Sequence, residues 1–247
     1  MSGHNKWSQI KHKKAITDAQ KGKVFTKLGN AITIAAREGG GDPVGNFKLK
    51  ALIDKAHSEN MPTENIQRSI KRGTGKLEGV KIEEITYEVF GPSGVALLIK
   101  AITDNKNRTV NEIRNLLTKF GGKLATGGVA HLFEQKGVIR IEIGNKDREN
   151  IEMTIIDAGA DDIQEDDDII NIYTKPQDLF LVKKNLEKAG LTTTSAELTL
   201  EPKTMVKIND DATAKKIINL METLDENSDV SSIYANFDID DTIMKRK

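Results

Sequence analysis

The chain has 247 residues, 37% of them hydrophobic and 30% charged, a balance typical of a soluble globular protein. It contains no cysteine, which excludes disulfides, thiolate metal sites and a thiol nucleophile. No apolar run approaches the length of a membrane span, and no secretory signal opens the sequence, so we expect a cytoplasmic protein that does not enter a membrane.

The charges are sorted along the chain, although 37 basic and 37 acidic side chains cancel overall. Residues 1–76 hold 15 basic and 6 acidic side chains, which leaves 22 basic and 31 acidic ones for the rest. Like charges repel one another within each part, so the separation lowers stability. It therefore favours a polyanionic partner for the basic part.

The basic part is predicted to be an arm followed by a small helical domain. Residues 1–15 have no apolar periodicity, whereas Phe25, Leu28 and Ile32 recur at helical spacing. The expected helices span residues 18–38, 45–59 and 61–72.

The glycine run GGGDP at 39–43 looks at first like a phosphate-binding loop. It lacks the Gly-Lys-Ser/Thr ending and follows a helix instead of a strand, so we interpret it as a helix stop. The run GTGK at 73–76 is interpreted as a linker. We therefore expect no nucleotide cofactor.

The remainder alternates strands and helices, and the predicted fold class is α+β. Strands are expected at residues 85–90, 95–103, 129–134, 138–143, 163–165, 169–173, 195–200, 205–208 and 230–237, and helices at 107–120, 147–158, 176–189 and 211–224. The order β-α-β-β-α-β between residues 138 and 200 is that of a ferredoxin-like unit. The flanking segments together supply a second such unit, which predicts one ferredoxin-like domain inserted in another.

The predicted domains are therefore three. They are residues 1–76, a discontinuous domain of residues 80–135 plus 204–240, and an inserted domain of residues 136–203.

Several long motifs occur in a fixed order along nearly the whole chain. They are GHNKW at 3–7, KHKK at 11–14, DAQKGKVFTK at 18–27, GGGDP at 39–43, NMPTENIQRSIKRGTG at 60–75, YEVFGPSGVALLI at 87–99, TDNKNRT at 103–109, FGGKLATGGVAHLF at 120–133 and YANFDI at 234–239. In these motifs the sequence resembles the YebC/PmpR family. That family includes bacterial proteins called probable transcriptional regulators and a mitochondrial translational activator. The resemblance implies a helical N-terminal domain, two α/β domains and a role in gene expression.

The candidate nucleic-acid contacts are basic side chains of the N-terminal part, with one tryptophan and one histidine among them. They are Lys6, Trp7, Lys11, His12, Lys13, Lys14, Lys21, Lys23, Lys27, Arg68, Lys71 and Arg72. Lysines neutralise phosphates but do not by themselves read sequence. Trp7 has two interpretations, because it could stack on an exposed base or anchor the arm to the protein.

A second candidate phosphate contact lies at Asn107 and Arg108, between a predicted strand and a predicted helix. The amide groups of a helix N-terminus can hold a phosphate. The alternative is ordinary capping, and Thr109 and Glu112 have the spacing of a capping box.

The sequence offers no constellation for catalysis or metal binding. Its four histidines are scattered, and the acidic run between residues 157 and 168 lacks the pattern of a calcium loop. That run is interpreted as a polar turn, with a nucleic-acid-repelling or protein-docking surface as the alternative. We expect a protein that is not an enzyme and has no cofactor.

Three functional classes remain for the chain. They are a DNA-binding transcriptional regulator, a translation factor that binds ribosomal or messenger RNA on the ribosome, and a protein-docking adaptor. No helix-turn-helix or zinc finger can be defended, which favours RNA over sequence-specific DNA. No heptad repeat or exposed apolar helix argues for an oligomer, so we expect a monomer.

Overall fold

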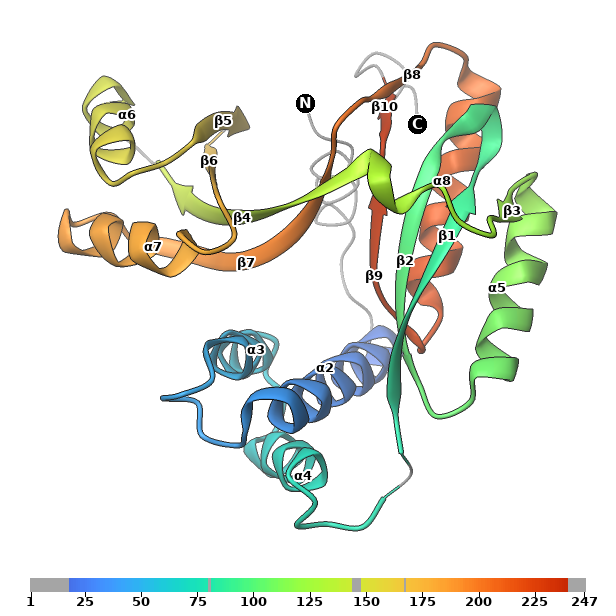
Figure 1. The fold of residues 1–247 in the computed structure, drawn as a ribbon, viewed down its shortest axis with the longest axis horizontal. Helices are drawn as coiled ribbons and strands as arrows, with labels where there is room; N and C mark the ends of the chain where they lie inside the picture. Colours follow the sequence, from blue (N-terminus) through green and yellow to red (C-terminus); the bar gives the residue numbers. More distant parts are fainter. Residues whose placement is uncertain (1–17, 80, 144–147, 167, 240–247) are drawn as a thin grey trace. The chain divides into compact units, whose positions relative to one another are not determined.

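A computed structural model describes residues 18–79, 81–143, 148–166 and 168–239 (Figure 1). The chain forms two compact units. One unit is Phe133–Glu201, and the other combines the segments before and after it. The division of the chain into three domains, with a boundary near residues 76–80, stays a prediction.

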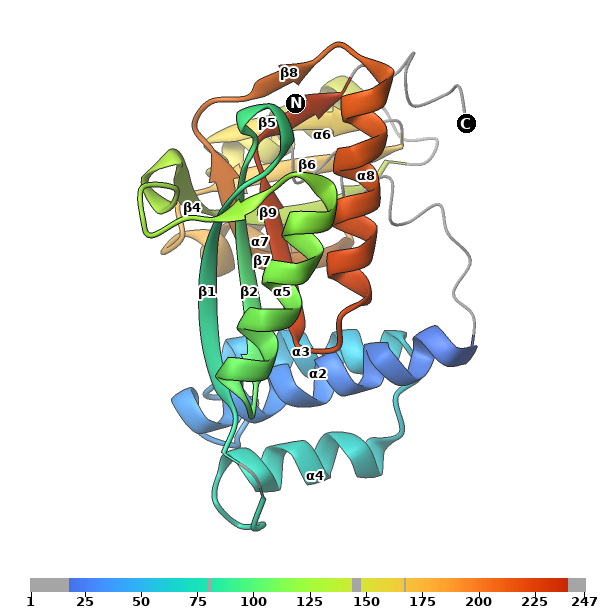
Figure 2. The same cartoon turned by 90° about the vertical axis from the view of Figure 1, so that its right-hand side faces the viewer.

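Three helices open the described chain. They are α2 (Asp18–Gly39), α3 (Phe47–Ser58) and α4 (Thr63–Gly73). Both α3 and α4 pack along α2 and contact each other little (Figure 2). Their shared core includes Leu28, Ile32, Leu49 and Ile66, which recur at helical spacing. The helix stop predicted at the glycine run is confirmed, because α2 ends at its first glycine.

A four-stranded antiparallel sheet, a separate pair of parallel strands and two long helices complete the discontinuous unit. Its elements are β1 (Glu83–Phe90), β2 (Ala96–Thr103), α5 (Lys106–Phe120), β3 (Lys123–Leu124), β8 (Val206–Ile208), α8 (Asp211–Glu226), β9 (Val230–Ala235) and β10 (Phe237–Ile239), with short 3-10 turns at Pro92–Gly94 and Ala130–Leu132. The strand order is β3-β1-β2-β9, and β8 pairs with β10. Helices α5 and α8 lie side by side on one face of the sheet (Figure 2).

The helical part is joined to this sheet through α2. Ile34 of α2 packs with Ile82 and with Ile102 near the end of β2. The Arg37 guanidinium also donates a 2.6 Å hydrogen bond to the carbonyl oxygen of Ile82. The helices and the sheet of this unit therefore share buried contacts.

The inserted unit has the predicted ferredoxin-like topology. Its elements are β4 (Phe133–Glu142), α6 (Arg148–Asp157), β5 (Asp162–Asp166), β6 (Ile169–Thr174), α7 (Leu179–Lys188) and β7 (Thr193–Pro202). The sheet order is β5-β6-β4-β7, and isoleucines of β4 and β6 face the two helices in one core. The predicted fold class, α+β with a helical part before the sheets, is confirmed.

The discontinuous sheet differs from the predicted strand arrangement in three places. The segment expected as a strand at 129–134 is a 3-10 turn that leads into β4. The predicted ferredoxin-like arrangement of this unit would place β8 beside β2, but β1 occupies that position, because the tight turn at Pro92–Gly94 pairs β1 directly with β2. The last predicted strand breaks at Asn236, whose side chain accepts a 2.7 Å hydrogen bond from the Ala96 amide.

Candidate nucleic-acid interface

Half of the predicted nucleic-acid contacts lie outside the described residues. They are Lys6, Trp7, Lys11, His12, Lys13 and Lys14. The other six belong to α2 and α4, so the structure describes a helical surface and not the arm.

The three lysines of α2 differ in their surroundings. Lys21 and Lys23 are exposed. The Lys27 ammonium instead donates a hydrogen bond to the carbonyl oxygen of Asp225 and lies 3.6 Å from its carboxylate. Because Asp225 belongs to α8, Lys27 connects the helical part to the end of α8, a role that the sequence pattern did not reveal.

The cations of α4 lie on its exposed side. Arg68 is paired with Glu64 one turn earlier, at 3.1 Å. No hydrogen bond or ion pair joins the side chain of Lys71 or of Arg72 to any residue that the structure describes. These two side chains are therefore available to an external anion.

Close packing against α2 fixes which side of α4 is exposed. Gly73 lies so near α2 that a Cβ atom there would be 2.3 Å from the carbonyl oxygen of Thr33. The Thr33 hydroxyl donates to the carbonyl oxygens of Gly29 and Ser69, at 2.8 and 3.1 Å. The opposite side of α4 therefore projects outward.

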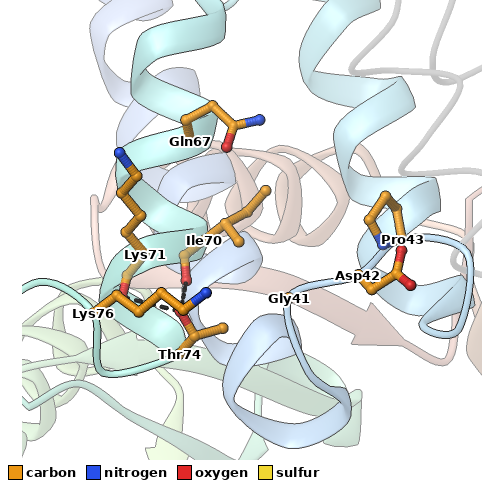
Figure 3. A pocket seen from close by; sticks show the side chains of 8 residues that line it. All are labelled: Gly41, Asp42, Pro43, Gln67, Ile70, Lys71, Thr74 and Lys76. Carbon is orange, nitrogen blue, oxygen red and sulfur yellow. Dashed lines mark hydrogen bonds between the residues drawn. The ribbon is translucent and has the colours of Figure 1, made fainter.

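A depression of about 500 Å³ lies beside the end of α4 (Figure 3). Its lining is Gly41, Asp42, Pro43, Gln67, Ile70, Lys71, Thr74 and Lys76. One wall comes from α4 and the residues after it, and the other from the loop between α2 and α3 (Figure 3). We call this depression the α4 pocket.

The loop wall of the α4 pocket is fixed by Asn46. Its buried side chain donates 2.8 Å hydrogen bonds to the carbonyl oxygens of Ala35 and Gly40. Its side-chain oxygen accepts from the Leu49 amide and so caps α3. A loop held by its own side chains does not need to be ordered by a ligand.

The α4 pocket has charges of both signs. Asp42 lies on the loop wall, and its carboxylate accepts a 3.0 Å hydrogen bond from the amide of Val44. Lys71 and Lys76 line the other wall, and no described residue pairs with either ammonium. Sequence reasoning missed Gln67, Thr74 and Lys76; the GTGK run at 73–76 was the signal, but it was interpreted as a linker.

Arg108 has internal partners. Its guanidinium lies 2.8 Å from the Asp229 carboxylate and 3.0 Å from Asp104. The predicted capping box is wrong, because the side chain of Asn105 caps α5 by accepting from the Arg108 amide. The N-terminus of α5 is thus capped within the protein, and Asn107 lies on its first turn, exposed.

Asp229 is the centre of a buried polar group, which we call the Asp229 cluster. Its carboxylate accepts hydrogen bonds from Arg108, from Thr109 at 2.7 Å and from Thr103 at 3.1 Å. Burial opposes ionisation, but the hydrogen bonds from Arg108 and Thr109 outweigh it and hold the pKa of Asp229 below its ordinary value. The same contact raises the pKa of Arg108. The cluster links β2, α5 and the turn before β9.

Within its described residues, the acidic region of the inserted unit holds no cluster of metal-binding side chains. No group of three histidine or carboxylate side chains within the described residues could hold a metal ion. A hydrogen bond with Glu165 raises the pKa of Glu152, and Arg148 lies 2.8 Å from Glu165. These exposed carboxylates interact with one another and with Arg148.

Among the described helices, none is both long and apolar enough to cross a membrane.

Comparisons with known proteins cover almost the whole chain. Residues 5–76 match the model of the TACO1/YebC protein N-terminal domain, and residues 82–237 match that of the TACO1/YebC second and third domain. A probable transcriptional regulatory protein of Persephonella marina is 49% identical, with 100% of this chain and 99% of that protein aligned. A protein of the same description from Thermosipho melanesiensis is 53% identical, with 99% and 97% aligned.

A solved structure agrees with these matches. The crystal structure of a conserved hypothetical protein, Aq1575, from Aquifex aeolicus superposes with a TM-score of 0.86. It is 46% identical and covers 95% of this chain and 97% of its own. Sequence motifs, fold and full-length similarity agree, and the chain belongs to the TACO1/YebC family.

Proposed function

We propose that the protein binds nucleic acid through its N-terminal part and regulates gene expression without catalysing a reaction. Relatives over the full length are named probable transcriptional regulatory proteins, which supports a regulatory role. The observation that carries the proposal is the exposed side of α4, where Lys71 and Arg72 have no described partner. Cationic side chains that form no ion pair within the protein can neutralise the phosphates of a nucleic acid.

The arm is expected to extend this surface. Residues 1–76 hold nine more basic than acidic side chains, and Lys11, Lys13 and Lys14 are three of the basic ones. Replacing the three with alanine should weaken binding to many sequences alike. It should also reduce the slope of log affinity against log salt concentration by about one for each phosphate that is no longer neutralised. Unchanged affinity in this variant would remove the arm from the mechanism.

The packing of the three N-terminal helices bears on the choice between DNA and RNA as the target. In a helix-turn-helix the second helix packs across the first and enters the major groove. Here α3 and α4 both pack along α2 and contact each other little, which is a poor match to that motif. A translation factor that binds ribosomal or messenger RNA is therefore the second candidate beside a DNA-binding regulator.

One experiment separates the functional classes. Cell extract is sedimented through a sucrose gradient at low and moderate salt, and nucleic acid crosslinked to the protein is sequenced. Ribosomal RNA fragments would support translation, and clustered promoter DNA would support transcription. Recovery of protein partners alone would support an adaptor and contradict the proposal. We expect a cytoplasmic protein, and light scattering of the purified protein tests the further expectation that it is a monomer.

A further inference from the structure

We propose that the α4 pocket binds one unpaired nucleotide of the nucleic acid, and that it favours a base with an exocyclic amino group. This inference rests on the proposed function, because it specifies how part of the bound strand is held. The walls of the pocket, its charges and its size each support it.

The two walls are held together by direct contact. A Cβ atom on Gly41 would lie 2.8 Å from the Thr74 methyl group and 3.1 Å from a methyl group of Ile70. The Thr74 hydroxyl donates to the carbonyl oxygens of Ile70 and Lys71, at 3.0 and 3.3 Å. The pocket is therefore largely formed before any ligand arrives, which reduces the ordering cost of binding.

The α4 wall is suited to a phosphate. Lys71 and Lys76 both line it, and neither ammonium is paired with a described residue. Their backbones are fixed relative to each other, because the Lys76 amide donates a 2.9 Å hydrogen bond to the carbonyl oxygen of Lys71. Two ammonium groups can neutralise one backbone phosphate and release its counterions.

The loop wall repels a phosphate and suits a different group. The Asp42 carboxylate accepts from Val44 but retains further acceptor sites. A carboxylate binds the exocyclic amino group of a base, as in contacts to the amino group of cytosine. The opposite charges of the two walls would thus orient a nucleotide, with its phosphate toward Lys71 and Lys76 and its base toward Asp42.

The remaining lining fits a base. Ile70 and Pro43 give apolar surface on the two walls, and Gln67 supplies an amide side chain without a described partner (Figure 3). The volume of about 500 Å³ lies in the range of small-ligand sites. The hydrogen-bonding edge of a base that enters the pocket cannot be engaged in a duplex, so the nucleotide must be unpaired.

The test compares oligocytidine with oligouridine, because cytosine has an exocyclic amino group at the position where uracil has a carbonyl oxygen. Binding of each labelled oligonucleotide to the full-length protein is measured by fluorescence anisotropy at low salt. We expect about fivefold to tenfold tighter binding of oligocytidine, in keeping with one specific base contact. Equal affinities would overturn the proposal.

Two variants locate the preference in the α4 pocket. Asp42→Asn keeps the acceptor for Val44 but adds an amide donor suited to the uracil carbonyl, so the preference should disappear or reverse. Asp54→Asn, at an exposed position of α3 outside the pocket, is the matched control and should keep it. A preference that survives Asp42→Asn would place the base elsewhere and overturn the assignment.

The lysine wall is tested by Lys71→Gln combined with Lys76→Gln. Both oligonucleotides should bind more weakly, and the salt slope should fall by about 0.7 for each single-strand phosphate that is no longer neutralised. Lys184→Gln combined with Lys188→Gln, at exposed positions of α7, is the matched control. An unchanged slope in the double variant would overturn the phosphate assignment.

The outcomes also distinguish this inference from the proposed function. If the wild type binds oligonucleotides with a normal salt dependence and no pocket variant changes it, the pocket proposal fails and nucleic-acid binding stands. If the protein binds neither single-stranded RNA, single-stranded DNA nor duplex at low salt, both fail. Amide shifts of Gly41 and Thr74 on adding cytidine monophosphate, and not on adding uridine monophosphate, give direct support.

Discussion

The Asp229 cluster and the α4 pocket use similar side chains with opposite outcomes. In the cluster, Arg108 and two threonine hydroxyls all donate to one buried carboxylate. In the pocket, Lys71 and Lys76 line a depression and no described residue pairs with either. These cations therefore fall into two groups, those that hold the fold together and those that no described residue pairs with.

This difference is visible only in three dimensions. Lys27 and Lys71 are both basic helical residues of the same charged region, and both were predicted from the sequence to contact nucleic acid. Lys27 bonds to Asp225, which lies 198 residues later in the chain. No local pattern could predict that partner. The variants below test the distinction, beginning with the largest expected effect.

Asp229→Ala should lower the free energy of unfolding by about 3 kcal/mol. The substitution leaves the buried hydroxyls of Thr103 and Thr109 without their shared acceptor and removes the partner of Arg108. Chemical denaturation measures the change. Asp104→Ala is the matched control, because Asp104 also pairs with Arg108 but at the surface, and it should change the free energy by less than about 1 kcal/mol. Equal effects of the two variants would contradict the role of the cluster.

Gly73→Ala should lower the free energy of unfolding by about 2 kcal/mol. The added methyl group would meet the Thr33 carbonyl oxygen and the Ala36 side chain, so α4 must move away from α2. Gly22→Ala provides the contrast in the same measurement. Its Cβ would have nothing within 4 Å, and alanine favours a helix over glycine by about 1 kcal/mol, so that variant should be stabilised. Similar changes in the free energy of unfolding for Gly73→Ala and Gly22→Ala would contradict the close approach of α4 to α2.

Acid should weaken the Asp229 cluster. The pKa of Asp229 in the folded protein lies below its ordinary value of 3.8, so the carboxylate contributes stability above about pH 4. That contribution is lost as pH falls through the folded pKa. The stability difference between wild type and Asp229→Asn should therefore shrink from pH 7 to pH 3 in thermal unfolding. Glu83 and Asp210, whose pKa values are also lowered, are present in both proteins and cancel.

Lys71→Gln combined with Lys76→Gln should leave the free energy of unfolding within about 0.5 kcal/mol of wild type. Surface substitutions that remove no internal contact have effects of that size. The measurement is the same denaturation experiment. A decrease in the free energy of unfolding as large as that of Asp229→Ala would mean that these lysines hold the fold together and are not left for a ligand.

Most of the fold could be predicted from local pattern. The helix predicted at 18–38 is α2, and the ferredoxin-like order of the inserted unit follows from periodicity and turn residues. Pairing in the discontinuous sheet could not be predicted in the same way. Strand β2 could pair either with β1, its hairpin neighbour in the sequence, or with the distant strand β8. In the structure it pairs with β1, and the spacing of the strands in the sequence does not predict which of the two pairings forms.

The candidate site was harder to predict than the fold. Lys71 followed from charge, but the α4 pocket requires the loop at Gly41 to lie against Thr74, which are 33 positions apart in the sequence. The run at 39–43 was interpreted correctly as a helix stop, whereas the run at 73–76 was interpreted only as a linker. Their contact, which creates the depression, depends on how α4 packs on α2.

The discontinuous unit also affects the order in which the chain folds during synthesis. Strand β9 pairs with β2 through contacts such as Leu97 with Ala235, and α8 packs on α5. During synthesis on the ribosome, β2 and α5 emerge long before those partners, whereas every strand of the inserted unit has emerged by Pro202. The inserted unit can therefore fold before the discontinuous unit, which should reach its final form only after α8 and β9 have emerged.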